Sequence, residues 1–220
     1  MKFMNNVQAM DQKIRAKSGR PKLDDAGRKV LAAARRRIVE GGLANLSARG
    51  LAAEAGCSVG TLYNNFRDLN GVIRQVNIAT TRRLETALED SLSRLPRDAG
   101  QTARLTAMAS VYLDFAMDNP NLWNALFEFR PKQLDDQRLP EMREAMLTRM
   151  MEAGAHGTDP MTDQDRVALR MLWASVHGVV SLVVNDFIPG ADRETARAYV
   201  NLVVSSGVAG YRTLLREERT

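Results

Sequence analysis

The sequence predicts an all-α protein. Apolar residues recur every three or four positions through most of the 220 residues, which is the spacing of amphipathic helices. No segment alternates β-branched and polar residues for long enough to predict a sheet. With 45% hydrophobic and 26% charged residues, the composition is that of a globular chain with a sizeable core.

Capping residues and glycines divide the chain into helices. Ser47 and Asp68 have short polar side chains that can cap a helix. Asp24 and Asp25 are acids that suit a helix N-terminus, and a further short helix begins at Ser58. A polar arm over 1–23 precedes them. The predicted helices cover 24–41, 47–55, 58–66, 68–95, 102–118, 121–129, 140–153, 163–187 and 192–216.

Cysteine usage and hydropathy favour a soluble protein of a reducing compartment. The single cysteine, Cys57, excludes an internal disulfide, and we interpret it as a small apolar residue in a turn rather than as a redox sensor. The first residues lack the apolar run of a secretory signal, and the longest apolar stretch, near 179–184, is too short to span a bilayer. We expect a cytoplasmic protein without membrane contact.

Charge is distributed unevenly along the chain. Residues 1–80 have 14 basic and 6 acidic side chains, whereas residues 81–220 have 17 basic and 20 acidic ones. A basic first third on a slightly acidic remainder indicates that one end meets a polyanion. Nucleic acid is the favoured partner, and a membrane surface or a simple solvated face is the alternative.

The segment from Leu51 to Leu62 has the spacing of a helix-turn-helix. Ala52 is small where two helices would cross, and Gly56 follows in a turn that needs a positive φ. Leu62 then falls at the inward position of the second helix. Such a motif holds its second helix rigidly enough to enter a major groove, so the segment predicts DNA binding.

Residues 24–83 resemble the N-terminal DNA-binding domain of the TetR family of regulators. The matching stretches are IVEGGLANL over 38–46, SARGLAAEAG over 47–56 and SVGTLYNNF over 58–66. The family usually has a lysine directly after the residue that caps its fourth helix, whereas here Leu69 follows Asp68. The missing phosphate contact is expected to come from Arg67 or from the basic arm.

The resemblance implies DNA contacts by nine residues: Ser47, Arg49, Ser58, Val59, Gly60, Thr61, Tyr63, Asn64 and Arg67. Ser47 and Arg49 would reach phosphates, and the start of the second helix would face base edges. No lysine or arginine lies within 58–66. Base readout would therefore rely on apolar contact from Val59, on the polar side chains of Thr61, Asn64 and Asn65, and on DNA shape.

The run from Trp173 to Gly178 resembles the Trp-His-Gly signature of one C-terminal subgroup of the same family. The resemblance implies a helical domain for effector binding and dimerisation. His177 could then form a hydrogen bond to an effector. The alternative is a core histidine bonded to a carbonyl or a hydroxyl group.

Large apolar and aromatic side chains are the other candidates for an effector cavity. They are Met108, Tyr112, Phe115, Trp123, Phe127, Met146, Met150 and Trp173. The chain has 11 methionines, whose flexible side chains suit a deformable pocket. The same residues would also suit an ordinary helical core.

Small residues gather in the last two predicted helices. They are Ala174, Ser175, Gly178, Ser205, Ser206, Gly207, Ala209 and Gly210. Small residues permit close helix crossings, and the resemblance implies that these helices pair with those of a second copy. A homodimer would match palindromic duplex DNA. Close packing within one subunit is the alternative.

These observations predict a basic N-terminal arm over 1–23, a helix-turn-helix DNA-binding domain over 24–70, and an effector-binding and dimerisation domain over 71–220. The predicted function is a sequence-specific transcriptional regulator, a repressor that a small apolar effector releases from DNA. No cofactor and no metal are expected.

Two other functions stay open. An architectural DNA-binding protein would share the basic head without needing an effector. An enzyme with a helical core is less favoured, because the common catalytic and nucleotide-binding motifs are missing from the sequence. A metal site at His156, with Asp159, Asp163 and Asp165 nearby, is conceivable, although solvated loop polarity explains these residues better.

Overall fold

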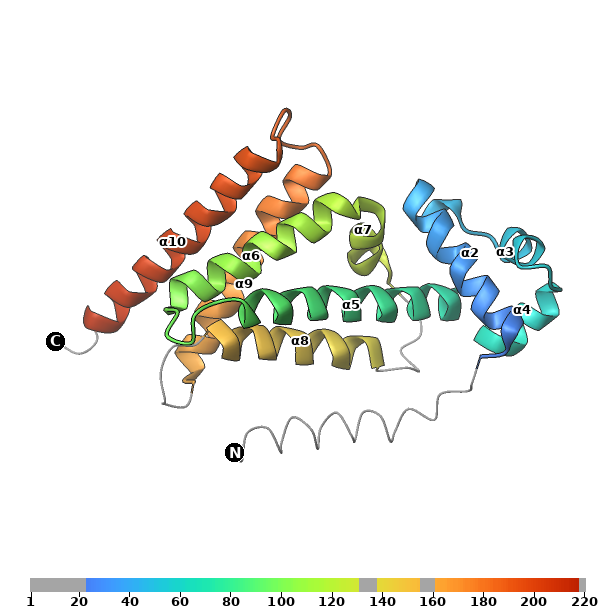
Figure 1. Cartoon of the computed structure of the whole chain (residues 1–220), viewed down its shortest axis with the longest axis horizontal. Coiled ribbons are helices and arrows are strands. Elements are labelled where there is room, and N and C mark those ends of the chain that lie inside the picture. Colours follow the sequence, from blue (N-terminus) through green and yellow to red (C-terminus); the bar gives the residue numbers. More distant parts are fainter. Residues whose placement is uncertain (1–22, 131–137, 155–160, 218–220) are drawn as a thin grey trace.

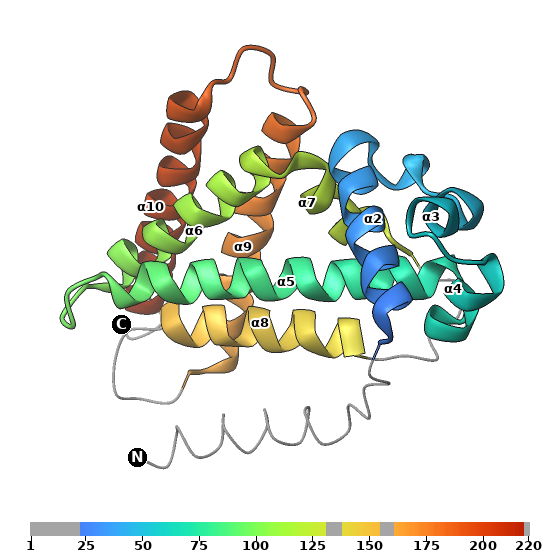
Figure 2. The same cartoon turned by 45° about the vertical axis from the view of Figure 1, so that its right-hand side comes forward.

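The computed structural model describes residues 23–130, 138–154 and 161–217, and within these ranges the regular structure is helical. Three helices, α2 to α4, form a small head at one end (Figure 1). The other helices form a larger second domain. One long helix, α5, starts at the head and runs along the whole of this second domain (Figure 2). The predicted all-α fold with a helix-turn-helix head is confirmed.

The head helices start where the sequence predicts. They are α2 (Asp25–Gly41), α3 (Ala48–Glu54) and α4 (Val59–Phe66), with a short 3₁₀ turn over Leu43–Asn45. Asp24, Ser47 and Ser58 each accept a hydrogen bond from the backbone amide three residues on, at 2.7, 3.1 and 3.0 Å. Gly56 between α3 and α4 has φ of 66°, as the predicted turn requires.

The second domain contains six helices in the described ranges. They are α5 (Leu69–Ser93), α6 (Gln101–Asp118), α7 (Pro120–Glu128), α8 (Arg138–Gly154), α9 (Asp163–Val184) and α10 (Arg193–Glu217). The capping residue of α5 is Asp68, and Thr162 and Asp165 form a capping box at α9. Residues 1–22 of the arm predicted over 1–23, and His156, lie outside the described residues.

Two main cores hold the helices together. The head core includes Val30, Ile38, Leu51, Leu62 and Val72, all fully buried. A larger core lies between α5, α6, α7, α9 and α10. Apolar burial of this kind contributes about 25 cal/mol per Å², so these cores stabilise the packing of the helices.

Helix α7 joins the head to the second domain. Leu122 and Ala125 of α7 are buried in the head core. The Nδ2 atom of Asn121 donates to the backbone oxygen of Val39 at the end of α2, at 2.9 Å. On another side of α7, the amides of Asn124 and Asn185 bond to each other at 2.9 Å. One short helix therefore touches both the head and the end of α9.

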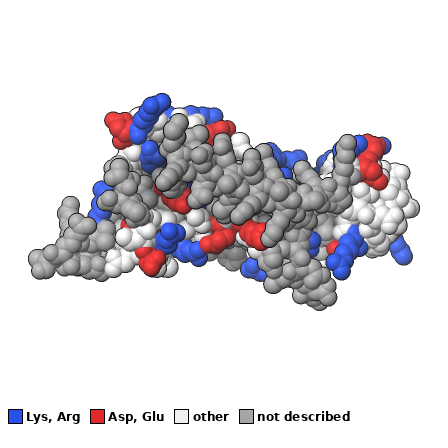
Figure 3. Space-filling view, turned by 90° about the horizontal axis from the view of Figure 1, so that it is seen from below, with Lys and Arg blue, Asp and Glu red and all other residues white. Residues whose placement is uncertain are grey.

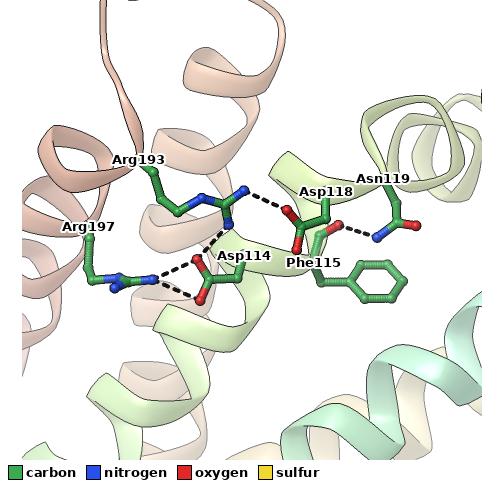
Figure 4. Close-up of polar contacts among 6 residues, drawn as sticks. All are labelled: Asp114, Phe115, Asp118, Asn119, Arg193 and Arg197. Carbon is green, nitrogen blue, oxygen red and sulfur yellow. Dashed lines mark hydrogen bonds and ion pairs between the residues drawn. The ribbon is translucent and has the colours of Figure 1, made fainter.

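An ion-pair network fastens α10 to α6 (Figure 4). Arg193 donates to Asp114 at 2.9 Å and to Asp118 at 2.5 Å, and Arg197 donates to both oxygens of Asp114. The hydrogen bonds with Asp114 and Asp118 raise the pKa of Arg193. The ring of Phe115 points away from this network (Figure 4). The network fixes the first turns of α10 beside the last turns of α6.

Candidate nucleic-acid interface and effector cavity

Helix α4 has one buried and one outward face. Leu62 is fully buried and Phe66 is 7% exposed, so both are core residues. Tyr63 and Asn64 are exposed, as is Gly60 in the first turn. The structure therefore places Gly60, Tyr63 and Asn64, which are predicted to contact DNA, on one outward surface of α4. A major groove is wide enough to admit an α-helix such as α4.

Hydroxyl groups cluster at the start of α4. The oxygen of Ser58 accepts from the Thr61 amide, and the two side-chain oxygens lie 2.9 Å apart. One hydroxyl hydrogen bridges the two oxygens, so the other hydroxyl keeps a hydrogen for an external acceptor. Val59 is half-buried. Thr61 is also half-buried, and its hydrogen bond with Ser58 fixes the position of its hydroxyl oxygen.

Helix α3 is fastened to α2 by a carboxylate that sequence reasoning missed. Glu54 accepts from Arg36 at 2.8 Å and from Arg37 at 2.7 Å. The hydrogen bonds from Arg37 and Arg36 lower the pKa of Glu54. The three consecutive arginines over 35–37 were the signal in the sequence that an acidic partner such as Glu54 would lie nearby. This clamp sets α3, with exposed Ser47 and Arg49 at its start, against the rest of the head.

Asn65 forms hydrogen bonds within the head. Its Nδ2 atom donates to Asp24 at 3.2 Å and to the backbone oxygen of Thr61 at 3.0 Å. A Cβ atom at Gly27 would lie 2.6 Å from Oδ1 of Asn65, so a larger residue there would push the Asn65 side chain aside. Asn65 is half-buried and contacts other head residues, and its expected role in base readout stays a prediction.

Arg67 ends α4 in an unusual backbone conformation. Its φ is 68°, in the region that disfavours side chains other than glycine, and its side chain is exposed. A few residues on, Gly71 of α5 is so close to the Phe66 carbonyl that a Cβ atom would lie 1.9 Å from the oxygen. The junction between α4 and α5 therefore leaves no room for a side chain at position 71.

The surface of the head carries charges of both signs. In the view from below, basic side chains surround the head at the right, next to acidic ones and to an uncharged area (Figure 3). Arg28 and Lys29 both pair with Asp25, which offsets part of the basic charge on α2. The net basic character of residues 1–80 thus depends strongly on the arm, which lies outside the described residues.

Aromatic rings surround His177 in the second domain. The ring of Trp173 stacks on it at 5.4 Å between centroids, and those of Phe127 and Trp123 lie at 4.4 and 5.2 Å. The hydroxyl of Tyr112 and Nδ1 of His177 share a hydrogen bond of 2.8 Å. Burial raises the pKa of Tyr112 and lowers that of His177, so both are neutral at pH 7.

A cavity of about 50 Å³ lies beside this cluster, between α6, α8, α9 and α10. Met108, Tyr112, Met150 and Trp173 line it, as predicted. The other predicted residues, Phe115, Trp123, Phe127, Met146 and His177, pack around it in the same core without lining it. Residues that sequence reasoning missed complete the lining: Leu105, Ala109, Leu147, Met151, Leu169, Leu172, Val176 and Val204.

The outer face of α9 and α10 is apolar and exposed. Val167 and Met171 of α9 are 63% and 62% exposed, and Leu202 of α10 is 66% exposed. Among the described helices, α9 has the length and composition of a membrane span, which core helices of soluble proteins share. A groove of about 880 Å³ runs along this face, so the single chain leaves much apolar surface uncovered.

A helix-turn-helix with an outward second helix, joined by a long helix to a separate helical domain, defines a class of transcription regulators. Two family models match this chain. The model of the bacterial regulatory proteins of the tetR family matches residues 30–76, and the model of the tetracyclin repressor-like C-terminal domain matches residues 105–205. The chain belongs to the TetR family and is a DNA-binding transcription regulator.

Individual relatives are distant in sequence. The chain is 23% identical over 159 residues to the HTH-type transcriptional regulator BetI of Vibrio campbellii, covering 69% of this chain and 76% of that protein. A structure of a protein with unknown function from Rhodococcus sp. RHA1 has a TM-score of 0.66 at 24% identity, covering 89% and 98% of the two chains. The regulator FadR of Bacillus subtilis, solved with stearoyl-CoA, has a TM-score of 0.55 at 21% identity, covering 80% and 97%.

Proposed function

We propose that this regulator is a cytoplasmic, dimeric repressor that a small, mainly apolar effector releases from palindromic operator DNA. It acts through binding and not through catalysis. The observation that carries the proposal is the course of α5. This helix begins directly after α4, the helix proposed to enter the major groove, and its last turns lie in the larger core, near His177. A ligand that changes the second domain can therefore change the position of the head.

The exposed face of α9 and α10 supports the dimer. Val167 and Met171 of one helix and Leu202 of the other form an apolar surface that water would otherwise cover. A Cβ atom added at Gly178 or Gly210 would meet no heavy atom within 4 Å in the described chain, so close packing within one subunit does not explain these glycines. A second copy packed against these helices explains the apolar surface and these two glycines, whereas Gly207 packs against Leu172 within the chain.

In this proposal the segment 24–70 binds DNA and the segment 71–220 binds the effector and the second copy. The nine residues that the family resemblance implied, from Ser47 to Arg67, make the DNA contacts. Phosphate contacts supply most of the affinity, and the outward side of α4 supplies the choice of site. Two heads on a two-fold axis then require two half-sites about 34 Å apart or a multiple of that distance.

The cavity between α6, α8, α9 and α10 supports an effector site. Its volume of about 50 Å³ is far below the roughly 300–1,000 Å³ of most ligand pockets, so binding must move side chains. Met108, Met150 and Met151 in its wall are unbranched and can move at small cost. The fold neighbour FadR, solved with stearoyl-CoA, supports a ligand-binding role for a domain of this shape.

Selection from a random library of duplex DNA tests the proposal. We expect enriched sites with two-fold symmetry, bound with an affinity that falls by about 10³-fold or more as salt rises from low to moderately high concentration. Replacement of Thr61 by alanine should weaken the enriched site by about 1–3 kcal/mol and leave scrambled DNA unaffected. Enrichment of no site, or binding that ignores sequence, would favour an architectural protein instead.

A further inference from the structure

The first two turns of α4 present an uncharged surface on their outward side. No lysine or arginine occurs in residues 58–66. Gly60 and Asn64 are exposed, and Val59 and Thr61 are half-buried beside them. In helix-turn-helix proteins the first residues of the second helix contact the base edges. These turns therefore offer the bases methyl groups, hydroxyls and a side-chain amide, and no cation.

Gly60 is a glycine that the fold of the chain does not require. It lies within α4, where alanine would make a more stable helix than glycine. A Cβ atom at Gly60 would lie 3.6 Å from Oγ of Ser58, which is an ordinary contact. Gly71 differs, because a Cβ atom there would collide with the Phe66 carbonyl. The bare backbone at Gly60 therefore serves a partner outside the chain, which can come close to α4 at this point.

One side-chain amide in these turns is available to a base. Asn64 is exposed one helical turn beyond Gly60, and its side chain forms no hydrogen bond within the described part of the chain. The neighbouring Asn65 differs, because its Nδ2 atom already donates to Asp24 and to the backbone oxygen of Thr61. An asparagine amide forms a pair of hydrogen bonds with adenine, whereas guanine is matched by arginine or lysine.

Gly60 has a β-branched residue on each side in the sequence. Val59 and Thr61 are both half-buried, so part of each side chain is at the surface. The side-chain oxygens of Thr61 and Ser58 lie 2.9 Å apart and share one hydroxyl hydrogen, which leaves the methyl group of Thr61 as its apolar contact. Thymine is the base that carries a methyl group in the major groove, and apolar side chains recognise it by contact.

We propose that the first two turns of α4 read A·T base pairs. Val59 and Thr61 contact thymine methyl groups, and Asn64 forms paired hydrogen bonds with an adenine. The missing side chain at Gly60 lets α4 come close enough for both contacts. This inference rests on the proposed function and names the class of base pair that each head selects.

Single replacements of thymine by deoxyuridine in one half-site of the enriched DNA test the methyl contacts. Deoxyuridine keeps the base pair and removes only the 5-methyl group. We expect affinity to fall about 3- to 10-fold at one or more positions. Val59→Ala or Thr61→Ser should make the two bases bind equally at one of these positions. Val39→Ala is the matched control, because it shortens an exposed valine of α2 in the same head, and it should keep the wild-type difference.

Two further variants test the amide and the glycine. Asn64→Ala should lose a preference of about 10-fold or more for A·T over G·C at one position. Gly60→Ala should weaken binding to the enriched site about 10-fold or more, because its methyl group keeps the base edges away, and it should raise the melting temperature. A structural role would move stability and affinity in the same direction. Gly100→Ala is the control: its added methyl group also meets no heavy atom within 4 Å, and it should leave DNA affinity unchanged.

Three results would overturn this inference and leave a sequence-specific regulator in place. They are equal binding of thymine and deoxyuridine at every position, G·C pairs at the positions that the Val59 and Asn64 variants affect, and wild-type DNA affinity in Gly60→Ala. A random library that enriches no site would overturn the inference together with the proposed function.

Discussion

The hydroxyl of Tyr112 on α6 lies 2.8 Å from Nδ1 of His177 on α9, and the hydrogen bond between them joins two helices through the middle of the larger core. Sequence analysis left His177 with two roles, an effector anchor or a core histidine bonded to a hydroxyl. The bond to Tyr112 supports the second role in the protein without ligand. An effector that binds Nδ1 of His177 must therefore compete with the Tyr112 hydroxyl.

The free energy of unfolding should decrease as the pH is lowered, because His177 is buried in its neutral form. Burial lowers the pKa of its imidazole below the ordinary value of 6.5, so the unfolded chain binds the proton more readily than the folded chain. The free energy of unfolding should therefore decrease as pH falls below about 6.5. Melting curves at pH 7.5 and 5.5 measure this loss, which should be smaller in His177→Gln.

The second histidine provides the control for that experiment. The chain has two histidines, and His156→Gln should keep the wild-type pH dependence. The carboxylates whose pKa values are lowered, such as Glu54 and Asp24, titrate below this range and do not contribute to it. Equal pH dependence in wild type and His177→Gln would show that burial of this imidazole has no effect on folding.

Arg67→Gly should raise stability while lowering DNA affinity. Glycine adopts the φ of 68° found at this position without the penalty of roughly 1 kcal/mol that other residues incur. Loss of the guanidinium should remove one phosphate contact per head and reduce the slope of affinity against salt by about one per contact. Arg67→Ala serves as the comparison, because it loses the same charge and keeps the strain. An unchanged salt slope in both variants would place Arg67 away from DNA.

Two glycines in the head should respond in opposite ways to alanine. Gly71→Ala places a methyl group against the Phe66 carbonyl and should destabilise the fold by about 1–3 kcal/mol or more. Gly60→Ala meets only the Ser58 hydroxyl at 3.6 Å, an ordinary contact, and should stabilise α4 by about 0.5–1 kcal/mol. Denaturant unfolding compares the two. Similar losses in both variants would mean that the α4–α5 junction has room to adjust.

Leu202→Arg should convert the protein into a monomer. The side chain is 66% exposed on the apolar face of α10, where a second copy would bury a charge without a partner. Light scattering should then give half the wild-type mass, and operator affinity should fall because the two heads are no longer joined. Thr86→Arg, on the exposed side of α5, adds the same charge as a control. A dimeric Leu202→Arg variant would require another interface.

Local signals explain why the helices could be predicted. A capping side chain accepts from an amide only three residues on, so Ser47 and Ser58 mark helix starts without any knowledge of the rest of the chain. The same holds for Gly56, whose positive φ is a property of one turn. Buried positions such as Leu62 follow from helical period alone.

Residues whose roles depend on distant partners could not be predicted. Asn65 packs against Gly27 and Asp24, far earlier in the chain, and nothing in the stretch around Asn65 distinguishes this from an outward side chain. The Glu54 clamp likewise needs the crossing of α2 and α3. The cavity lining also depends on helix crossings, so Trp123 and His177, which were predicted as effector-binding residues of the cavity, pack beside it without lining it.

The bond between Asn121 and the Val39 carbonyl bears on how this protein can diversify. The last carbonyl groups of any helix lack an internal partner, and the acceptor here is main chain, so a different sequence in α2 would still offer it. A head with other side chains on its outward face can therefore keep this hydrogen bond to α7, provided that the head residues packed around Leu122 and Ala125 stay the same. The outward face of the head can thus change its sequence while the main-chain contact that holds the head against α7 stays the same.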